Sequence, residues 1–204
     1  MISWDISILH LINREWSHPL LDWLMPAVSA INAWLPLIIL ALLLVLWHGG
    51  RRGVRLVLCL AVALGVSDGL ISHTLKSVVG RVRPRNAISE VMIRDLGPGK
   101  PEFMRLFTQP TQYLSKGSAD LKGNSFPSSH VMNMFAAAMV IAMIHLRTGL
   151  AMFALATLVA YSRVYVGAHW PSDIAPSIGM GLLVGWAVTR SVAKLWPHQE
   201  AITS

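Results

Sequence analysis

The stretch Ser162–Asp173 reads SRVYVGAHWPSD and joins two apolar segments of the chain, near 150–163 and 173–193. It places a cation, an imidazole and a carboxylate at the edges of segments apolar enough to enter a membrane. Charge at that depth is costly unless it faces a polar cavity or a partner, so such a residue indicates a functional site. We therefore expect a membrane protein with a polar site at one end of its helices.

The composition also indicates a membrane protein. The chain has 204 residues, of which 54% are hydrophobic and 13% are charged, whereas a soluble domain is about one quarter charged. The net charge of +7 suits nucleic acid only if the basic residues line one face. They flank apolar spans instead, so we expect no nucleic-acid partner. Anionic membrane lipids or a phosphorylated substrate fit this charge better.

The apolar segments predict where the helices lie. Segment 20–47 is long for one crossing, which needs about 20 residues, and prolines interrupt it. We interpret it as one kinked crossing, with two short elements as the alternative. Further crossings are expected over 54–79, 129–146, 150–163 and 173–193.

Residues 1–17 predict an amphipathic helix that lies in the membrane interface. Its apolar side chains recur at helical spacing, with Asp5 and Arg14 off that stripe. The fold class predicted for 1–204 is thus a single all-α domain, a polytopic transmembrane bundle with an N-terminal interfacial helix. The polar segment 81–127 is expected to form an extramembrane loop. This loop is expected to carry part of the site. Its residues 86–126 either cover the site or recognise a headgroup, or they form a mobile solvated loop.

A second polar string, Lys76–Pro84 (KSVVGRVRP), ends the crossing over 54–79. On a continuous helix Lys76 and Arg83 would share one face but lie about 10 Å apart along the axis, too far to hold one phosphate. Gly80 and Pro84 predict a turn instead, because a residue before proline is disfavoured in the helical region. The two cations then converge on an anion. The alternative is ordinary snorkelling of basic side chains at a helix end.

A third string, Pro127–His130 (PSSH), opens an apolar helix. Serine is a preferred N-cap, and a helix start presents free N–H groups and a positive dipole end, which favour an anion. The alternative is a plain cap with a histidine at the interface.

In Ser162–Asp173, the spacing of four between His169 and Asp173 lets the carboxylate reach the imidazole. That bond would set the tautomer and leave the other ring nitrogen free to attack. The alternative for Asp173 is that it complements the dipole of the last helix. Farther down the second crossing, Asp68 is interpreted as part of a structural polar network beneath the site.

The three strings together resemble those of the type 2 phosphatidic acid phosphatase (PAP2) superfamily. That family's pattern is K-x6-R-P, then P-S-G-H, then S-R-x5-H-x3-D. The order and both internal spacings agree here, and two strings match at every fixed position. One position departs from the pattern, because Ser129 stands where the family has glycine.

The resemblance implies a PAP2/haloperoxidase-like core and a role for each matching residue. His169 is implied as the nucleophile that forms a phosphohistidine, Asp173 orients it, and His130 protonates the leaving oxygen. No cofactor and no metal are expected, because positive side chains replace them. The residues implied to hold the phosphoryl oxygens are Lys76, Arg83, Arg163, Ser128 and Ser129.

The predicted function is a membrane lipid phosphatase, a metal-independent hydrolase, with undecaprenyl diphosphate as the first substrate choice. Phosphatidylglycerol phosphate, phosphatidic acid and lipid A are alternatives, as is transfer of the phosphoryl group to an acceptor lipid. A non-catalytic transporter or binder of lipid phosphates is the alternative from another class.

The basic residues at alternate helix ends predict the orientation. Short basic loops favour the cytoplasm, which places the three strings on the periplasmic side of a bacterial inner membrane. The residues that carry this argument are Arg51, Arg52, Arg55, Arg147, Arg190 and Lys194.

Overall fold

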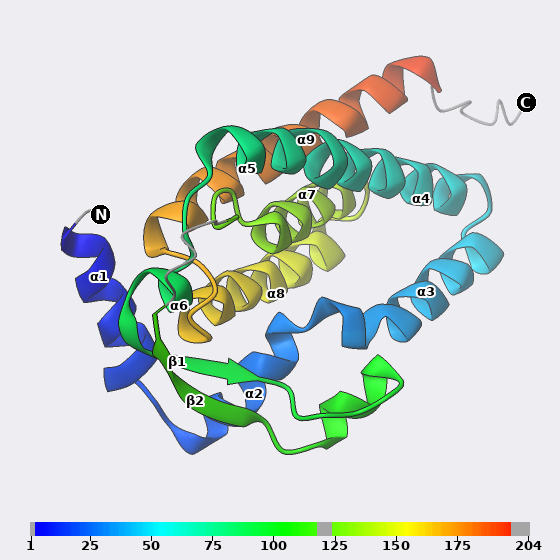
Figure 1. The fold of residues 1–204 in the computed structure, drawn as a ribbon. Coiled ribbons are helices and arrows are strands. Elements are labelled where there is room, and N and C mark those ends of the chain that lie inside the picture. The colour runs from blue at the N-terminus through cyan, green and yellow to red at the C-terminus, as the bar shows by residue number, and fades with distance from the viewer. Residues whose placement is uncertain (1–2, 118–123, 197–204) are drawn as a thin grey trace, which may run out of the picture.

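The protein is a helical bundle with a small two-stranded sheet at one end (Figure 1). The structure is a computed structural model and describes residues 3–117 and 124–196. The helical bundle confirms the predicted fold class, and the short sheet adds to it. The elements run in the order α1 (Ser3–His10), η1 (Leu11–Glu15), α2 (Pro19–Ser29), α3 (Ile31–His48), α4 (Gly50–Leu64), η2 (Gly65–Ser72), α5 (His73–Val79), α6 (Pro84–Ala87), β1 (Ser89–Asp95), η3 (Glu102–Phe107), β2 (Thr111–Lys116), α7 (Ser129–Ile144), α8 (Leu146–Tyr165) and α9 (Pro171–Leu195).

Helix α7 lies at the centre of the bundle, between α4, α8 and α9 (Figure 1). It buries Val131, Ala136 and Val140 completely. Glycines let α9 approach it closely, because a Cβ at Gly181 would lie 2.4 Å from the carbonyl oxygen of Met132. This close contact fixes the positions of α7 and α9 relative to each other. The first turns of these two helices carry two of the polar strings.

Four helical segments are long and apolar enough to cross a membrane, and α7 is a shorter apolar helix of the same bundle. Their outer faces expose large apolar side chains, most of all on α3, where Trp47 is 84% exposed. Apolar surface of this kind is stable only against lipid. The protein is therefore a multi-pass membrane protein. The four segments are Ile31–His48, Gly50–Ala87, Leu146–Tyr165 and Pro171–Leu195.

The segment 20–47 holds one crossing, as predicted, but the prediction that it forms one kinked helix is wrong. Two elements are present, as in the alternative, but α3 is not short, since it has 18 residues. Helix α2 ends at Ser29, and Ala30 leaves the helical region with φ −92° and ψ 70°. The indole N–H of Trp34 donates to the carbonyl oxygen of Ala27 at 2.8 Å. This side-chain bond adds a second donor to a carbonyl that also accepts the N–H of Ala30, at 3.3 Å, at the end of the helix. Only α3 then has the length and hydropathy of a crossing within this segment.

The N-terminal helix packs differently from the predicted amphipathic pattern. Asp5, which we expected off the buried stripe, is completely buried together with Leu9, whereas Trp4 and Ile8 are exposed. The buried face of α1 is therefore the one that carries Asp5. Its placement in the membrane interface stays a prediction.

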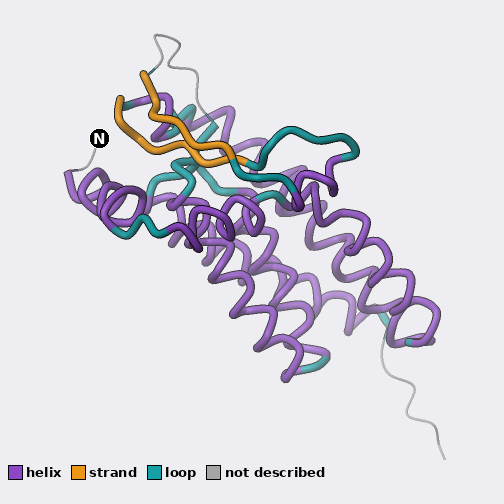
Figure 2. Tube along the Cα trace, turned by 90° about the horizontal axis from the view of Figure 1, so that it is seen from below, coloured by secondary structure: helices purple, strands orange, loops and turns teal. Residues whose placement is uncertain are grey.

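Within the predicted loop, residues 89–116 fold into a hairpin across one end of the bundle. Strands β1 and β2 pair antiparallel, with Ile93 opposite Tyr113, and Figure 2 shows them over the helix ends. The buried guanidinium of Arg94 donates to the carbonyl oxygens of Asn13 at 2.8 Å and Tyr165 at 3.2 Å. These bonds tie β1 to the end of α8. The described part of this segment thus lies over the helix ends, and its role in covering the site or recognising a headgroup stays a prediction.

Candidate active site

The three polar strings meet at the end of the bundle beneath the hairpin. The ends of α5 and α8 and the starts of α7 and α9 lie together there (Figure 1). His130, at the start of α7, lies within electrostatic range of four side chains drawn from the other two strings. These four are Lys76, Arg83, Arg163 and His169. The tertiary structure therefore brings both histidines and all three predicted cations to one place.

The first string turns as its sequence predicts. Helix α5 ends at Val79, and Gly80 adopts a left-handed conformation with φ 57°. Arg83 is extended, with φ −70° and ψ 150°, directly before Pro84. Glycine accepts this conformation at little cost, so the chain reverses and brings Arg83 back toward Lys76.

Ser129 holds the amino group of Lys76. Nζ of Lys76 donates a hydrogen bond to Oγ of Ser129, and the same hydroxyl lies 2.5 Å from Oγ of Ser72. A glycine at this position, as in the family pattern, would have no side chain to offer. The polar network that we predicted beneath the site therefore uses Ser72, whereas Asp68 is exposed and acts on Lys76 through its charge.

Ser128 occupies the predicted N-cap position of α7, but its side chain makes no capping bond. Its backbone N–H donates to Oγ of Ser177 at 2.9 Å, and Ser177 in turn donates to the carbonyl oxygen of Asp173 at 2.6 Å. Within 3–117 and 124–196, the buried Oγ of Ser128 has no hydrogen-bond partner. A buried hydroxyl without a partner is costly, so it is available for a ligand.

His169 is held by a backbone carbonyl as well as by Asp173. Its Nδ1 lies 2.7 Å from the carbonyl oxygen of Ser125 and 3.7 Å from Oδ2 of Asp173. The predicted direct bond to the carboxylate is thus too long for a hydrogen bond. Because a carbonyl only accepts, Nδ1 carries the proton and Nε2 has the free lone pair.

Burial keeps the ring of His169 neutral at neutral pH. The side chain is 2% exposed, and this burial lowers the pKa of His169 from 6.5 to about 4. Asp173 opposes that change, while the charges of Arg163 and Arg83 add to it. A neutral imidazole with a free Nε2 is the nucleophilic form.

Gly167 shapes the loop that presents His169. Its φ is +71°, and a Cβ there would lie 2.5 Å from Cγ1 of Val91. The N–H groups of Ala168 and His169 both donate to the carbonyl oxygen of Arg163, at 3.0 and 3.2 Å. This tight turn places the ring next to the last turn of α8.

Arg163 is oriented by a residue that sequence reasoning missed. Its Nη1 donates to Oγ and to the carbonyl oxygen of Ser29, the latter at 3.3 Å. Its buried Nε has no partner in the described parts of the chain. Ser29 comes from α2, and nothing in its local sequence marks it. A free N–H on a cation beside two histidines suits a phosphoryl oxygen.

Arg81 and Ser125 are two more site residues that the sequence did not reveal. Nη1 of Arg81 donates to Oδ1 of Asp173, and Oγ of Ser125 donates to Oδ2 of Asp173, both at 2.5 Å. Arg81 lies between Lys76 and Arg83 in the first string, which is the one signal that pointed to it. Together they satisfy the carboxylate and hold it in place.

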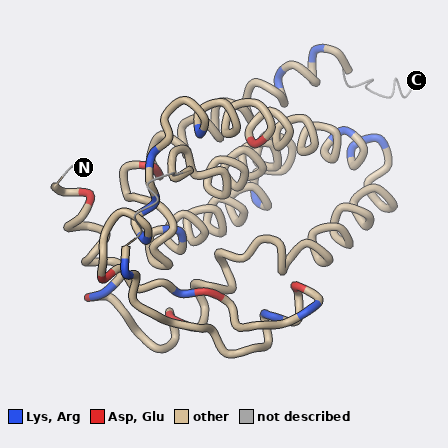
Figure 3. The backbone as a smooth tube through the Cα atoms, viewed as in Figure 1, with Lys and Arg blue, Asp and Glu red and all other residues tan. Residues whose placement is uncertain are grey.

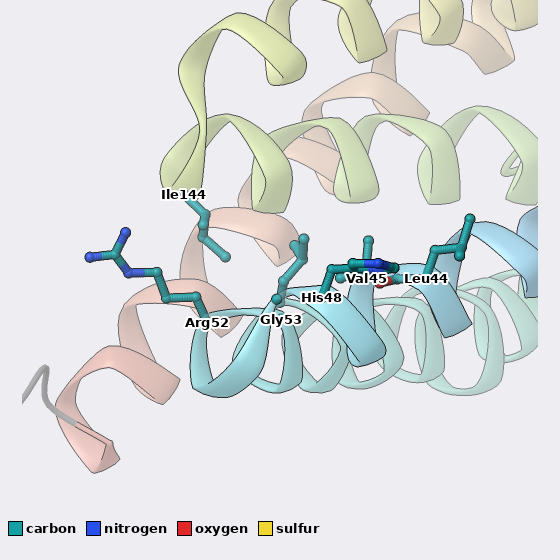
Figure 4. A pocket seen from close by; sticks show the side chains of 8 residues that line it. Leu44, Val45, His48, Arg52, Gly53 and Ile144 are labelled. Atoms are coloured by element: carbon teal, nitrogen blue, oxygen red, sulfur yellow. Dashed lines mark hydrogen bonds between the residues drawn. The ribbon is translucent and has the colours of Figure 1, made fainter.

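A groove of about 460 Å³ lies at the opposite end of the bundle (Figure 4). There the guanidinium of Arg52 points outward, and Figure 3 shows other basic residues near the same turn. The groove is remote from the three strings and is not part of the site. The residues that line it are Leu44, Val45, His48, Gly49, Arg52, Gly53, Leu56 and Ile144. Among the residues that the structure describes, no three His, Cys, Asp or Glu side chains are grouped to hold a metal ion.

Several known proteins are similar to this chain in sequence or in fold over most of their own length. A lipid A 4'-phosphatase of Bacteroides thetaiotaomicron is 28% identical over 189 residues, which cover 91% of this chain and 76% of that protein. An undecaprenyl-diphosphatase of Sulfolobus acidocaldarius is 27% identical over 195 residues, covering 94% and 78%. The crystal structure of Aquifex aeolicus LpxE superposes with a TM-score of 0.66 at 22% identity and covers 93% of this chain and 96% of its own. This last likeness concerns the fold.

The sequence model of the PAP2 superfamily matches residues 54–197, a range that includes all three strings and more than half of the chain. The motifs, the bundle and this match agree with one another. The chain belongs to the PAP2 superfamily, and it is a multi-pass membrane phosphatase of that family, a hydrolase.

Proposed function

We propose that this protein removes the terminal phosphate of a lipid diphosphate, undecaprenyl diphosphate first among them, through a phosphohistidine on His169. The observation that carries the proposal is the state of that ring. Its Nδ1 donates to the carbonyl oxygen of Ser125, which leaves the lone pair of the neutral ring on Nε2. A neutral, oriented imidazole beside three cations supports in-line attack on phosphorus.

In the first step, Nε2 of His169 attacks the terminal phosphorus and forms a P–N bond. The P–O bond to the lipid phosphate breaks, and His130, which takes up a proton when the anionic substrate binds beside it, donates that proton to the leaving oxygen. Charge on the three non-bridging oxygens is offset by Lys76, Arg83 and Arg163. Preorganised donors of this kind contribute about 10²–10³-fold each.

In the second step, water attacks the phosphohistidine. His130, now neutral, takes a proton from that water, and the P–N bond breaks to release inorganic phosphate and neutral His169. Between the two steps the imidazole ring carries positive charge, which the negative charge of Asp173, 3.7 Å from Nδ1, stabilises. The free Oγ of Ser128 and the N–H of Ser129 donate to the phosphoryl oxygens during both steps.

The relatives support a lipid substrate with a terminal phosphate. They include an undecaprenyl-diphosphatase and a lipid A 4'-phosphatase, so both headgroup classes belong in the test. The four crossings expose apolar surface next to the site end. A long acyl or isoprenoid chain that remains in the membrane fits this arrangement.

We propose that the site faces the periplasm, with the bundle in the inner membrane. The end of the bundle opposite the site carries short basic segments, which favour the cytoplasm. Figure 3 shows basic residues at the turn between α3 and α4 and at the end of α9. The residues concerned are Arg51, Arg52, Arg55, Arg147, Arg190 and Lys194.

The direct test measures phosphate release by purified protein in detergent micelles. The panel contains undecaprenyl diphosphate, phosphatidylglycerol phosphate, phosphatidic acid and lipid A, each with EDTA present. We expect release from undecaprenyl diphosphate at the highest kcat/KM, full activity in EDTA, and none in His169→Ala. Activity that EDTA removes and Mg²⁺ restores would contradict the metal-independent mechanism. Binding of the lipids without turnover by the parent protein would contradict an enzyme.

A further inference from the structure

The guanidinium group of Arg81 lies between two buried carboxylates that come from opposite ends of the chain. It donates to Asp173 through Nη1 and to Asp5 through Nη2, with both N–O distances 2.5 Å. Both carboxylates are 0% exposed, whereas the Arg81 side chain is 24% exposed. The planar fork of arginine suits two acceptors at once, and a lysine could not replace it. Helix α1 thus reaches the carboxylate beside the nucleophile through a single side chain.

Asp5 also caps the helix that carries Asp173. Its Oδ1 accepts the backbone N–H of Ser172 at 2.9 Å, and its Oδ2 accepts the hydroxyl of Ser172 at 2.6 Å. The first N–H groups of a helix have no partner within it. Asp5 supplies an acceptor for the N–H of Ser172 from 167 residues away in the sequence. Ser172 is the neighbour of Asp173, the carboxylate beside His169.

The charges of this cluster have a consequence for the reaction. Asp5, Arg81 and Asp173 together carry one net negative charge, because one cation is shared between two anions. If Asp5 were neutral, the charge of Arg81 would offset that of Asp173 in full. With Asp5 in place, net negative charge remains close to His169, whose ring becomes positive when it is phosphorylated. In a buried site such charges interact strongly.

We propose that Asp5 is a positioning residue for phosphoryl transfer, which acts through Arg81 to hold Asp173 in place beside His169 and to leave its negative charge only partly offset. The proposal rests on the function proposed above, in which His169 is the nucleophile. It makes the N-terminal helix a part of the active site, although that helix contributes to none of the three strings.

The first test compares Asp5→Asn, Asp5→Ala and a matched control, Glu15→Gln. Glu15 is an exposed carboxylate of the same N-terminal region, and its replacement leaves kcat unchanged. Asp5→Asn keeps an acceptor for Ser172 but removes the charge. We expect it to lower kcat about 10- to 100-fold with KM unchanged, as Asp5→Ala does. If Asp5→Asn has the kcat of the wild type, Asp5 only caps the helix and the proposal is wrong.

A double-mutant cycle tests whether Asp5 acts through Arg81. In an Arg81→Met background the shared cation is gone, so Asp5→Asn should no longer lower kcat. Losses of the two variants that multiply in the double variant would overturn the proposal. Thermal unfolding of each variant in detergent identifies any that fail to fold, and Asp5→Asn, which is nearly isosteric, is the variant that decides.

Orthovanadate separates this proposal from the proposed function. It adopts the five-coordinate geometry of phosphoryl transfer and needs no lipid, and such analogues bind tightly to the site that they mimic. We expect the vanadate Kd to rise about 10- to 100-fold in Asp5→Asn and not in Glu15→Gln. If the wild type binds vanadate but hydrolyses no lipid of the panel, the lipid function fails, and the vanadate affinities decide the role of Asp5. Equal kcat and equal vanadate affinity in wild type and Asp5→Asn overturn that role while the function stands. A wild type that neither hydrolyses nor binds overturns both.

Discussion

Lys76 of α5 donates a hydrogen bond to the side chain of Ser129 at the start of α7, across 53 residues of sequence. The bond joins a predicted phosphate-binding cation to the one position where this chain departs from the family pattern. It gives the departure a physical role, because the added hydroxyl orients the amino group. A charge-assisted bond of this kind contributes about 1.5–3 kcal/mol.

Replacement of Ser129 by alanine should therefore weaken the site without destroying it. We expect kcat/KM to fall about tenfold, which corresponds to about 1.4 kcal/mol, because Lys76 keeps its charge but loses its orientation. Lys76→Met removes the charge itself and should cost about 100-fold or more. Steady-state phosphate release measures both. A loss in Ser129→Ala as large as that in Lys76→Met would show that the serine contacts the phosphate directly.

Asp173→Asn should lower kcat less than the same substitution does in enzymes where the carboxylate alone sets the tautomer of the histidine. Where the carboxylate has that role, the amide costs about 10⁴-fold in kcat. Here the carbonyl of Ser125 holds the Nδ1 proton at 2.7 Å, so the tautomer survives. The amide loses the charge and one of the two acceptor oxygens to which Arg81 and Ser125 donate. We expect about 100-fold in kcat. Single-turnover phosphate release measures it, and a loss near 10⁴-fold would place the tautomer under the control of Asp173 instead.

The pH dependence of kcat/KM should have its acid limb near pH 4. The pKa of His169 is lowered by burial to about 4, below the ordinary value of about 6.5. The neutral ring is the reactive form, so activity is retained as pH falls through 6.5 and is lost as it falls through 4. The pH profile of kcat/KM reports the free enzyme. Ionisation of the substrate phosphate, followed by ³¹P NMR, is the necessary correction. After that correction, an acid limb centred near pH 6.5 would contradict the neutral, buried ring.

Gly167→Ala should destabilise the loop that presents His169. The backbone there has φ +71°, and the added Cβ would lie 2.5 Å from Val91. Strained conformations of this kind cost about 1–3 kcal/mol each, so the thermal midpoint and kcat should both fall. Gly179→Ala is the matched control, because nothing lies within 4 Å of its added Cβ and alanine favours a helix. Equal midpoints for the two variants in detergent would count against the strained turn.

Local chemistry was sufficient for the crossings and for the first string. Hydrophobic runs predict helices because a chain in lipid must satisfy its own backbone, and three of the predicted crossings agree with α7, α8 and α9. Gly80 permits a left-handed backbone, and Pro84 restricts its own backbone and that of Arg83, so the turn at the end of α5 follows from neighbouring residues alone. The break at Ala30 was missed because Pro26 and Pro36 are both accommodated within helices, and the end of α2 depends on packing.

The residues that contact and orient the reactive groups could be identified only in the folded structure. The carbonyl of Ser125 that holds His169 is a group that every residue carries, so no sequence pattern marks it. Ser29 reaches Arg163 across 134 residues and Asp5 reaches Arg81 across 76. Each of these contacts exists because separate helices pack side by side, and the burial of apolar surface that drives this packing has no direction of its own. The amino-acid order therefore predicts which groups bind the phosphate, and the packing of the bundle decides which groups hold these side chains in place.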